Sequence, residues 1–210
     1  MNYFKVLLIV FFSAILVSSC KQPQEARKPI SHSSGSFMKQ SIARAKKIIA
    51  KEEDQIEAVI KSNPKKQYLS SHKGYWYCYE NRNLTDTINP KKGDIAFFEY
   101  EIKDLKGNII YSQEELEPQI YKVDKQEIMM GLRDGIKLMR KKEKVQFLFT
   151  SHMGYGYHGD NNKIGMSQPL ACTVTLNDFM PEAEYNKRMH PATVVKSAPV
   201  KSNIKDTLTN

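Results

Sequence analysis

Few side chains in this sequence have the type and the spacing that chemistry needs. Tyr155 stands between Gly154 and Gly156 in a polar part of the chain. Core packing gives no reason for a tyrosine between two glycines in such a loop, so we take it as the first candidate functional residue. Its phenolic hydroxyl can donate and accept hydrogen bonds. The chemistry that it offers is hydrogen bonding to a polar group of a bound molecule.

Residues that form disulfides or bind metals are sparse. Besides Cys20 there are two cysteines, Cys78 and Cys172, which could pair in an oxidising compartment and could equally be two buried thiols. The histidines have neither ligand spacing nor a cysteine cluster nearby; they are His32, His72, His152, His158 and His190. The sequence therefore predicts no metal site, and it leaves the state of the two cysteines open.

The first twenty residues have the pattern of a targeting segment. Lys5 precedes the apolar run from Val6 to Val17, which has the length of a signal-peptide core and is short for a membrane span. The run ends in Val17-Ser18-Ser19-Cys20, which resembles the lipobox of bacterial lipoproteins. The alternative is an ordinary secretory signal that happens to end near a cysteine. We expect residues 1–19 to be a signal peptide and Cys20 to be the lipid attachment site.

Two or three acyl chains on Cys20 would hold the protein to a bilayer, because one chain binds only marginally and paired chains bind stably. Lys21 follows the cysteine, and nothing there resembles an acidic signal for retention in the inner membrane. The expectation is an exported protein, lipid-anchored to the outer membrane and facing the periplasm.

The formal net charge is +9 at pH 7 and the sequence pI is about 9.3. Such a charge suggests nucleic acid as a partner of a cytoplasmic protein, but an exported lipoprotein meets little of it. Lysines are spread along the whole chain, so anionic lipid, acidic proteins or no partner at all are the remaining interpretations. The basic run 140–144 is expected to be a solvated turn, and no nucleic-acid partner is predicted.

After the signal, a chain of 210 residues holds one compact domain with extensions. Residues 20–37 are polar and are expected to be a flexible tether. In 38–63, apolar residues recur at steps of three and four and predict one amphipathic helix that stops at Asn63-Pro64. These residues are Ile42, Ala45, Ile49, Ile56, Val59 and Ile60. The apolar stripe of this helix must pack against the domain of the same chain or against a second copy of the protein, and packing against its own domain is the commoner arrangement.

The remaining elements predict an α+β fold with a single core. A connector over 64–84 contains a strand at Tyr75 to Tyr79, and three later strands each alternate apolar and polar residues. These strands run from Asp94 to Ile102, from Val145 to Phe149 and from Leu170 to Leu176. Between them, Leu132, Ile136 and Met139 have helical spacing, which places a short helix against an antiparallel sheet. The tail 181–210 has no period and is expected to be mostly disordered.

Two segments resemble the FKBP-type peptidyl-prolyl isomerases. In 125–139, Glu127, Gly131, Gly135 and Met139 fall on the family's pattern of a strand that leads into the central helix beneath the active site. The run 154–159, Gly-Tyr-Gly-Tyr-His-Gly, is similar to the family's Ala-Tyr-Gly loop, with Ile164 at the family's spacing after it. Upstream, 90–94, Tyr100 and Lys106-Gly107 match the opening of the domain.

The resemblance covers residues 85–180 and implies an FKBP-like antiparallel sheet, a half-barrel wrapped around a short helix, preceded by the amphipathic helix. The order of elements is similar to that of the FKBP lipoproteins associated with gliding motility in Bacteroidota. It runs from a lipobox to a helix, then to a strand with Gly-Tyr-Trp-Tyr at 74–77, and then to the domain. The implied function is isomerisation of X-Pro bonds in client proteins of the cell envelope, assisting folding or assembly, without a cofactor. The competing hypothesis is a binding module or chaperone component that holds proline-containing loops and catalyses nothing.

The resemblance also assigns roles to residues. Tyr155 would be a hydroxyl donor and Met129 would hold a substrate carbonyl through its N–H, and both are the predicted catalytic residues. Tyr100 would be an aromatic wall, Ile128 the pocket edge and Ile164 an apolar lid. Other positions depart from the family: its floor Trp is Leu132, its Asp is Tyr111, and its three further Phe positions are Ile110, Gln119 and Cys172. The predicted pocket is therefore less aromatic and lacks the family's carboxylate, which puts its catalytic rate and macrolide affinity in doubt.

Overall fold

The computed structural model describes residues 34–189. The predicted signal peptide 1–19, the lipid attachment site Cys20, most of the tether 20–37 and the end of the tail from residue 190 lie outside the described residues. The chain divides into two units, Met1–Ile42 and Ala43–Asn210. All the features below that contact one another belong to the second unit.

Helix α2 spans Ser34–Ser62 and is the amphipathic helix that the sequence predicts. It begins four residues before the predicted start at residue 38, because the Ser-Gly-Ser sequence at residues 34–36 has no apolar spacing that would predict a helix. Its end is well supported. The Ser62 hydroxyl and the Asn63 side-chain amide both donate to the Val59 carbonyl, at 2.8 and 3.0 Å, before Pro64 stops the helix. Among residues 34–189, no helix combines the length and the apolar character that crossing a membrane requires.

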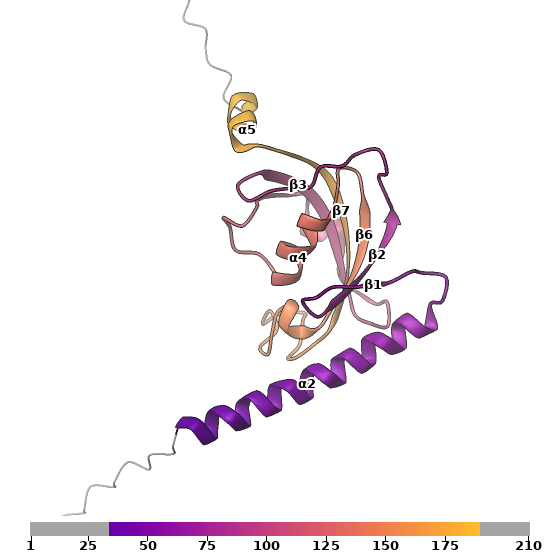
Figure 1. Ribbon diagram of the computed structural model, residues 1–210, viewed down its shortest axis with the longest axis vertical. Helices are drawn as coiled ribbons and strands as arrows, with labels where there is room; N and C mark the ends of the chain where they lie inside the picture. Colours follow the sequence, from indigo (N-terminus) through magenta and orange to yellow (C-terminus); the bar gives the residue numbers. More distant parts are fainter. Residues whose placement is uncertain (1–33, 190–210) are drawn as a thin grey trace, which may run out of the picture. The chain divides into compact units, whose positions relative to one another are not determined.

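Seven strands form one antiparallel sheet, which confirms the predicted α+β class (Figure 1). The strands are β1 (Leu69–Ser70), β2 (Tyr75–Asn81), β3 (Ile95–Lys103), β4 (Ile109–Tyr111), β5 (Gln119–Lys122), β6 (Lys144–Phe149) and β7 (Leu170–Met180). Their order is β1-β2-β6-β7-β3-β4, and β5 also pairs with β3. The short helices are α3 (Gln113–Leu116), α4 (Met130–Gly135), η1 (Ile136–Leu138), η2 (Ser151–Met153) and α5 (Glu182–Met189).

The strand registers separate two faces of the sheet, because neighbouring residues of a strand point to opposite sides. One row of paired residues is Tyr77, Phe147 and Cys172, which belong to or pack against the large apolar core. We call this side the inner face. The adjacent row is Trp76, Leu148 and Ala171, which belong to or pack against a smaller cluster with helix α2. We call this side the outer face.

The two cysteines of the sheet lie on different faces. Cys172 pairs with Phe147 on the inner face, whereas Cys78 pairs with Gln146, whose other partner is Thr173, on the outer face. Both cysteines are buried and free. Of the two interpretations left open by the sequence, the structure shows buried thiols, because the thickness of the sheet keeps them apart.

Two glycines set how closely α4 approaches the inner face. A Cβ on Gly131 would lie 2.4 Å from the Phe149 ring, and one on Gly135 would lie 2.8 Å from the Phe147 ring. The two rings are stacked with centroids 5.4 Å apart. The helix therefore rests directly on the rings, and the predicted helical residues Leu132, Ile136 and Met139 are all buried there. Figure 1 shows α4 against this side of the sheet.

The C-terminal half of α2 packs on the outer face. Ile56 is fully buried with Leu148 and Ala171, and Val59 and Ile60 pack around them. The domain itself thus covers this half of the predicted apolar stripe. Farther toward the N-terminus, Ile42 remains 49 % exposed.

The predicted disorder of the tail is wrong for its first residues, which form helix α5 (Glu182–Met189). The sequence has no apolar period here, but its charges suit a helix: Glu182 and Glu184 lie in the first turn and Lys187 and Arg188 in the last. Arg188 and Glu184 form an i,i+4 ion pair at 2.5 Å. The charges and the contact of Tyr185 with the Phe97 ring, whose centroids are 5.9 Å apart, therefore both favour this helix, which hydrophobic patterning did not predict.

The basic run 140–144 is a turn before β6, as expected, but one of its residues is not solvated. Glu143 is 1 % exposed, and its carboxylate accepts hydrogen bonds from the Arg140 N–H at 2.8 Å and the Asn83 N–H at 3.1 Å. The buried carboxylate joins the connector to the turn. Its charge alone predicted an exposed side chain, because one of the two hydrogen bonds that satisfy the carboxylate comes from the distant backbone of Asn83.

Candidate functional site

All nine residues that were predicted to contact a substrate lie in or against one apolar cluster. Three are buried members of it: Leu132, Ile164 and Cys172. Six are half-buried and pack against it: Tyr100, Ile110, Tyr111, Ile128, Met129 and Tyr155. They come from β3, β4, the segment before α4, α4 itself, the loop between β6 and β7, and β7. We call this group the apolar site.

The loop over 150–169 joins β6 to β7, and we call it the Tyr155 loop. Its first turn is η2 (Ser151–Met153). The Ser151 carbonyl accepts the N–H of Gly154 at 3.0 Å and the N–H of Gly156 at 2.7 Å. Gly156 has φ +71°, which favours glycine. The Ser151 carbonyl therefore fixes the N–H groups of both neighbours of Tyr155.

The Tyr155 hydroxyl is available to a ligand. It forms no hydrogen bond with any other described residue, 34–189, and no buried side-chain polar atom in that range lacks a partner, so the hydroxyl must be accessible. Burial of the ring raises the pKa of Tyr155 above its ordinary value of 10.0, and neighbouring Tyr100 and Cys172 raise it further. The hydroxyl therefore stays protonated, and able to donate, throughout the neutral pH range.

A carboxylate does reach this region, which corrects the expectation that the site has none. The Tyr111 hydroxyl donates to the Asp160 carboxylate, and Asp160 is also among the charges that raise the pKa of Tyr155. The second oxygen of Asp160 accepts the N–H groups of Asn162 at 2.9 Å and Ile164 at 2.8 Å. Burial acts to raise the pKa of Asp160, but these hydrogen bonds outweigh it and hold that pKa low. The sequence comparison missed this because Asp160 belongs to the loop and not to β4.

Gly159 fixes the path of the loop just before Asp160. Its φ is +72°, and a Cβ there would lie 2.1 Å from the Ile164 carbonyl oxygen. Only glycine fits at this close approach of two backbones. The closure places Ile164 in the apolar cluster, where it is 3 % exposed. The predicted lid residue is thus packed onto the site by the loop's own geometry.

Two further predicted positions have clear local roles. The Gln119 side-chain amide donates to the carbonyls of Leu116 at 2.6 Å and Glu117 at 3.2 Å, so it supports the backbone after α3 and is no wall of the site. Met129 is the N-cap residue just before α4, and its carbonyl accepts the Arg133 N–H at 3.0 Å. Its own N–H precedes the helix and is not used by it.

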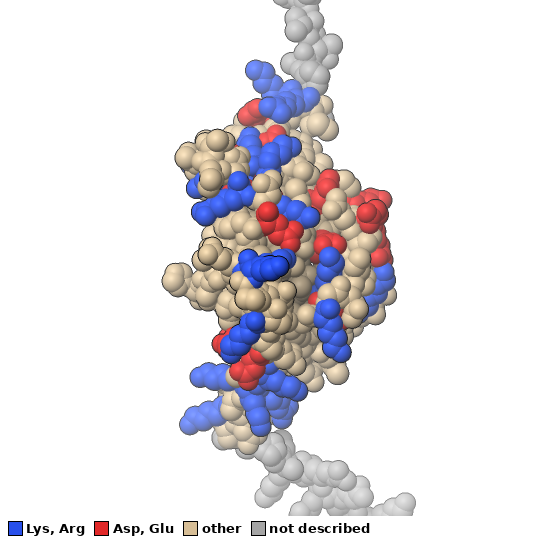
Figure 2. Space-filling view, turned by 90° about the vertical axis from the view of Figure 1, so that its right-hand side faces the viewer, with Lys and Arg blue, Asp and Glu red and all other residues tan. Residues whose placement is uncertain are grey.

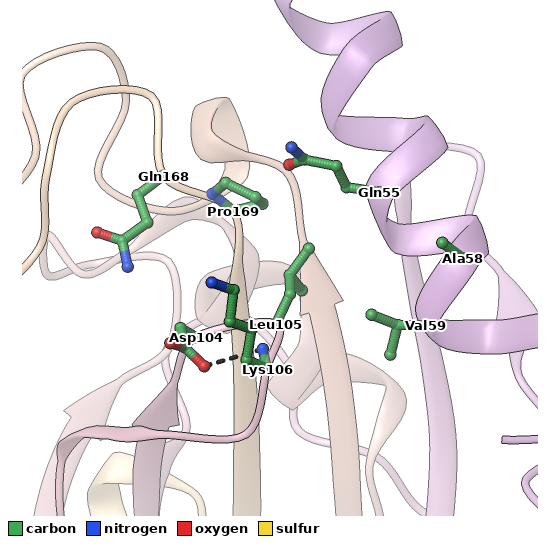
Figure 3. Close-up of a pocket in the computed structure, with 8 residues that line it drawn as sticks. All are labelled: Gln55, Ala58, Val59, Asp104, Leu105, Lys106, Gln168 and Pro169. Carbon is green, nitrogen blue, oxygen red and sulfur yellow. Dashed lines mark hydrogen bonds between the residues drawn. The ribbon is translucent and has the colours of Figure 1, made fainter. Parts of the chain in front are cut away.

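One cavity lies beside the apolar site, and a second lies next to helix α2, which covers the outer face of the sheet. One of about 580 Å³ is lined by charged residues of α4 and by Met130 and His152. Another of about 450 Å³ lies between α2 and the β3–β4 turn (Figure 3). In Figure 3, Val59 and Ala58 of α2 face Leu105, and Pro169 closes the far side. Neither contains Tyr155, and neither brings together groups for the predicted chemistry.

On the face that Figure 2 shows, basic side chains gather most densely at the lower end of the described molecule, and acidic ones lie mainly in the middle and on the right. Many are paired, such as Arg133 and Lys137 with Asp124, and Lys73 with Asp134. Among residues 34–189, no three His, Cys, Asp or Glu side chains are grouped so that they could hold a metal ion.

Sequence reasoning missed the contact that supports the start of the Tyr155 loop. Glu52 of α2 is 3 % exposed, and its carboxylate accepts hydrogen bonds from Ser151. A signal was present: Glu52 lies three residues after Ile49 and four before Ile56, on the apolar stripe itself. A charged residue on a buried stripe indicates a specific polar partner.

Comparisons with known proteins agree with this geometry. Residues 86–177 match the family model of the FKBP-type peptidyl-prolyl cis-trans isomerases. A curated relative, a probable FKBP-type peptidyl-prolyl cis-trans isomerase of Haemophilus influenzae, is 28 % identical over 120 residues, which are 57 % of this chain and 48 % of that protein. The chain therefore spans about half the length of this relative.

Two solved structures share the fold. The crystal structure of FkpA from Escherichia coli has a TM-score of 0.52 at 20 % identity and covers 84 % of this chain and 82 % of its own. A peptidyl-prolyl cis-trans isomerase from Pseudomonas syringae pv. tomato has a TM-score of 0.51 at 16 % identity, covering 64 % of this chain and 94 % of its own. At these identities the likeness concerns the fold. Together with the matched segment, it shows an FKBP-like fold, in which residues 86–177 are similar to the FKBP-type peptidyl-prolyl cis-trans isomerases.

Proposed function

We propose that this domain catalyses the cis–trans isomerisation of X-Pro peptide bonds in client proteins and needs no cofactor. The observation that carries the proposal is the Tyr155 hydroxyl, which is accessible and unpaired within the described chain at the edge of a large apolar cluster. The reaction itself is inferred from the similarity of residues 86–177 to the FKBP-type peptidyl-prolyl cis-trans isomerases.

The reaction asks little chemistry of the protein, because rotation about an X-Pro bond breaks no bond. Its barrier of about 18–20 kcal/mol comes from amide resonance, and the uncatalysed step takes tens to hundreds of seconds. A dry apolar site favours the twisted amide, since the planar amide is more polar and loses more on leaving water. A thousandfold acceleration requires only about 4 kcal/mol.

The residues of the apolar site divide into two kinds of contribution. Tyr155 and Met129 would supply the donors that hold the carbonyls next to the rotating bond. Buried Leu132, Cys172 and Ile164 would form the dry apolar packing beneath the proline ring. The half-buried residues would surround the ring; they are Tyr100, Ile110, Tyr111 and Ile128.

A binding module is the second candidate, and the composition of the site favours it specifically. Leu132 and Cys172 stand where the family has large aromatic residues, and Gln119 faces backbone carbonyls. A shallower site can hold a proline-containing loop without accelerating its rotation. Such a protein would act as a chaperone component.

A protease-coupled isomerisation assay on a short X-Pro peptide separates the two candidates. We expect the wild type to accelerate isomerisation, and Tyr155→Phe to be slower by about one to two powers of ten, because one donor in a dry site is lost. The same change should alter stability by about 1 kcal/mol or less. Leu132→Val is the matched control, since it trims the base of the site and leaves both donors.

Each outcome of this assay decides something. Equal rates for Tyr155→Phe and the wild type would show that the loop does not hold the substrate. No catalysis by the wild type, together with suppression of the aggregation of an unfolded protein, would establish the binding module.

For the cellular setting we propose a lipid anchor at Cys20, clients among envelope proteins, and a part in gliding motility. The supporting observation is the sequence 17–20 after an apolar run, together with the order of lipobox, helix, strand and domain. Cys20→Ala should leave the protein without lipid and soluble in the envelope. Metabolic labelling with a palmitate analogue measures this, and label retained on the variant would refute the anchor.

A further inference from the structure

Helix α2 lies beside both ends of the Tyr155 loop and contacts the first of them. Phe149, the last residue of β6, pairs with Leu170, the first residue of β7, so the two ends of the Tyr155 loop lie side by side. One residue inward, Leu148 and Ala171 form the buried outer-face cluster with Ile56 of α2. Gln55 of the same helix lines a cavity with Pro169, the last residue of the loop (Figure 3).

The polar part of this contact is a buried carboxylate with one partner residue. The two oxygens of Glu52 accept hydrogen bonds from the Ser151 N–H and the Ser151 hydroxyl, both at 2.7 Å. No basic side chain among residues 34–189 forms an ion pair with Glu52. A buried carboxylate is costly unless it is hydrogen-bonded, so Ser151 is held firmly in this one position.

Ser151 passes this constraint to the candidate donor. Its carbonyl accepts the N–H groups of Gly154 and Gly156, which flank Tyr155. Glu52 thus fixes Ser151 from one side, and Ser151 fixes both neighbours of Tyr155 from the other.

We propose that Glu52 is a positioning residue for Tyr155, so that α2 sets the geometry of an active site that it does not touch. The inference rests on the proposed isomerase function and adds to it a residue outside the matched domain, 86–177. A misplacement of about 1 Å at a catalytic group can cost on the order of a hundredfold in rate, so control of this loop is a direct route to activity.

The test uses the full chain with three variants. Glu52→Gln keeps the shape and can keep both contacts, with its oxygen accepting the Ser151 N–H and its NH₂ donating to the Ser151 hydroxyl. Two charge-assisted hydrogen bonds thereby become neutral ones, which are about half as strong. Ile56→Val trims the packing of α2 four residues away and leaves Ser151 untouched. We expect Glu52→Gln to lower kcat/KM by about tenfold, mainly through kcat, and Ile56→Val to leave it within about twofold at a similar loss of melting temperature. Ser151→Ala, which retains the N–H donor, is the milder variant should Glu52→Gln fold poorly.

A double variant tests whether Glu52 affects activity through Tyr155. If Glu52 acts through Tyr155, adding Glu52→Gln to Tyr155→Phe should lower kcat/KM by less than twofold, because the hydroxyl that it positions is already gone. Independent, multiplying losses would overturn the proposal.

Amide hydrogen exchange separates this proposal from the proposed function. In Glu52→Gln the Gly154 and Gly156 amides should exchange at least tenfold faster than in the wild type and in Ile56→Val, because their shared acceptor is loosened. If the wild type does not isomerise X-Pro peptides, the isomerase proposal fails while this result still supports positioning of the loop. Unchanged exchange at both glycines would refute the role of Glu52 whatever the activity.

Discussion

The inner face of the sheet and the outer face are covered in different ways. On the inner face, α4 lies on stacked aromatic rings so closely that two of its residues must be glycine. On the outer face, α2 contributes one fully buried residue, Ile56, and one buried carboxylate, Glu52. Close packing therefore determines the fit of the inner helix, whereas two hydrogen bonds from Ser151 and the packing of Ile56 hold the outer one. The apolar site is built on the first face and its loop is held from the second.

Adjacent residues of β6 point to opposite faces of the sheet, so substituting them one at a time compares the stability that each face contributes. Phe147→Ala should lower the free energy of unfolding by about 3–5 kcal/mol, as expected for a buried aromatic ring in a close-packed core. Leu148→Ala should cost about 2–3 kcal/mol, the lower part of the range for buried leucine, because the outer cluster is small and can relax. Urea unfolding measures both. A larger loss of unfolding free energy for Leu148→Ala than for Phe147→Ala would show that the main core lies on the outer face.

A smaller effect is expected where the inner face is already full. Gly131→Ala places a Cβ 2.4 Å from a ring that is held in a stack, and overpacking of this kind costs about 1–3 kcal/mol. The better helix propensity of alanine offers at most about 1 kcal/mol, so the net change should be destabilising. Gly35→Ala in α2, where a Cβ meets nothing within 4 Å, is the control and should be neutral or stabilising. Equal thermal stability of the two variants would contradict the close fit.

High pH tests the burial of two tyrosine rings, those of Tyr75 and Tyr155. Burial raises the pKa of Tyr75 above its ordinary value of 10.0, with Asp134 adding to the effect, and burial does the same for Tyr155. Because their folded pKa values exceed the unfolded ones, the stability that these groups contribute is complete below pH 10 and is lost as the pH rises above it. Urea unfolding at about pH 8 and about pH 11 should show this decline. Tyr75→Phe should flatten it, and an unchanged slope would remove Tyr75 as a cause.

The smallest effect concerns the two thiols, studied in the Cys20→Ala protein. Burial raises the pKa of Cys172, which lies beneath the apolar site, and also that of Cys78. Cys78 borders an open cavity of about 430 Å³, however, and Cys172 is completely buried. A thiol reagent should therefore modify Cys78 first under native conditions, and mild oxidation should not join the two. Mass spectrometry reads both results, and a native disulfide would show that the faces are assigned wrongly.

Most of the architecture follows from local patterns in the sequence. Alternation predicts β3, β6 and β7, helical spacing predicts α2 and the buried residues of α4, and family resemblance brings nine site residues to one cluster. The parts that escape prediction depend on contacts between distant segments. Asp160 reaches Tyr111, Glu52 reaches Ser151 and Glu143 reaches Asn83, and each acidic residue is surface-like by type alone. Helix α5 and the short strands β1, β4 and β5 have too few residues for a period to be visible.

The position of β2 has a practical consequence for work with fragments. This strand precedes the matched domain, yet it pairs with β6 along Tyr75 to Asn81. A recombinant fragment cut at residue 86 would turn β6 into an edge strand, with unpaired backbone groups beside Val145, Phe147 and Phe149. Such an apolar edge is a template for intermolecular strand addition, so the fragment should aggregate. The smallest piece suited to expression therefore begins ahead of β1 and keeps the C-terminal turns of α2.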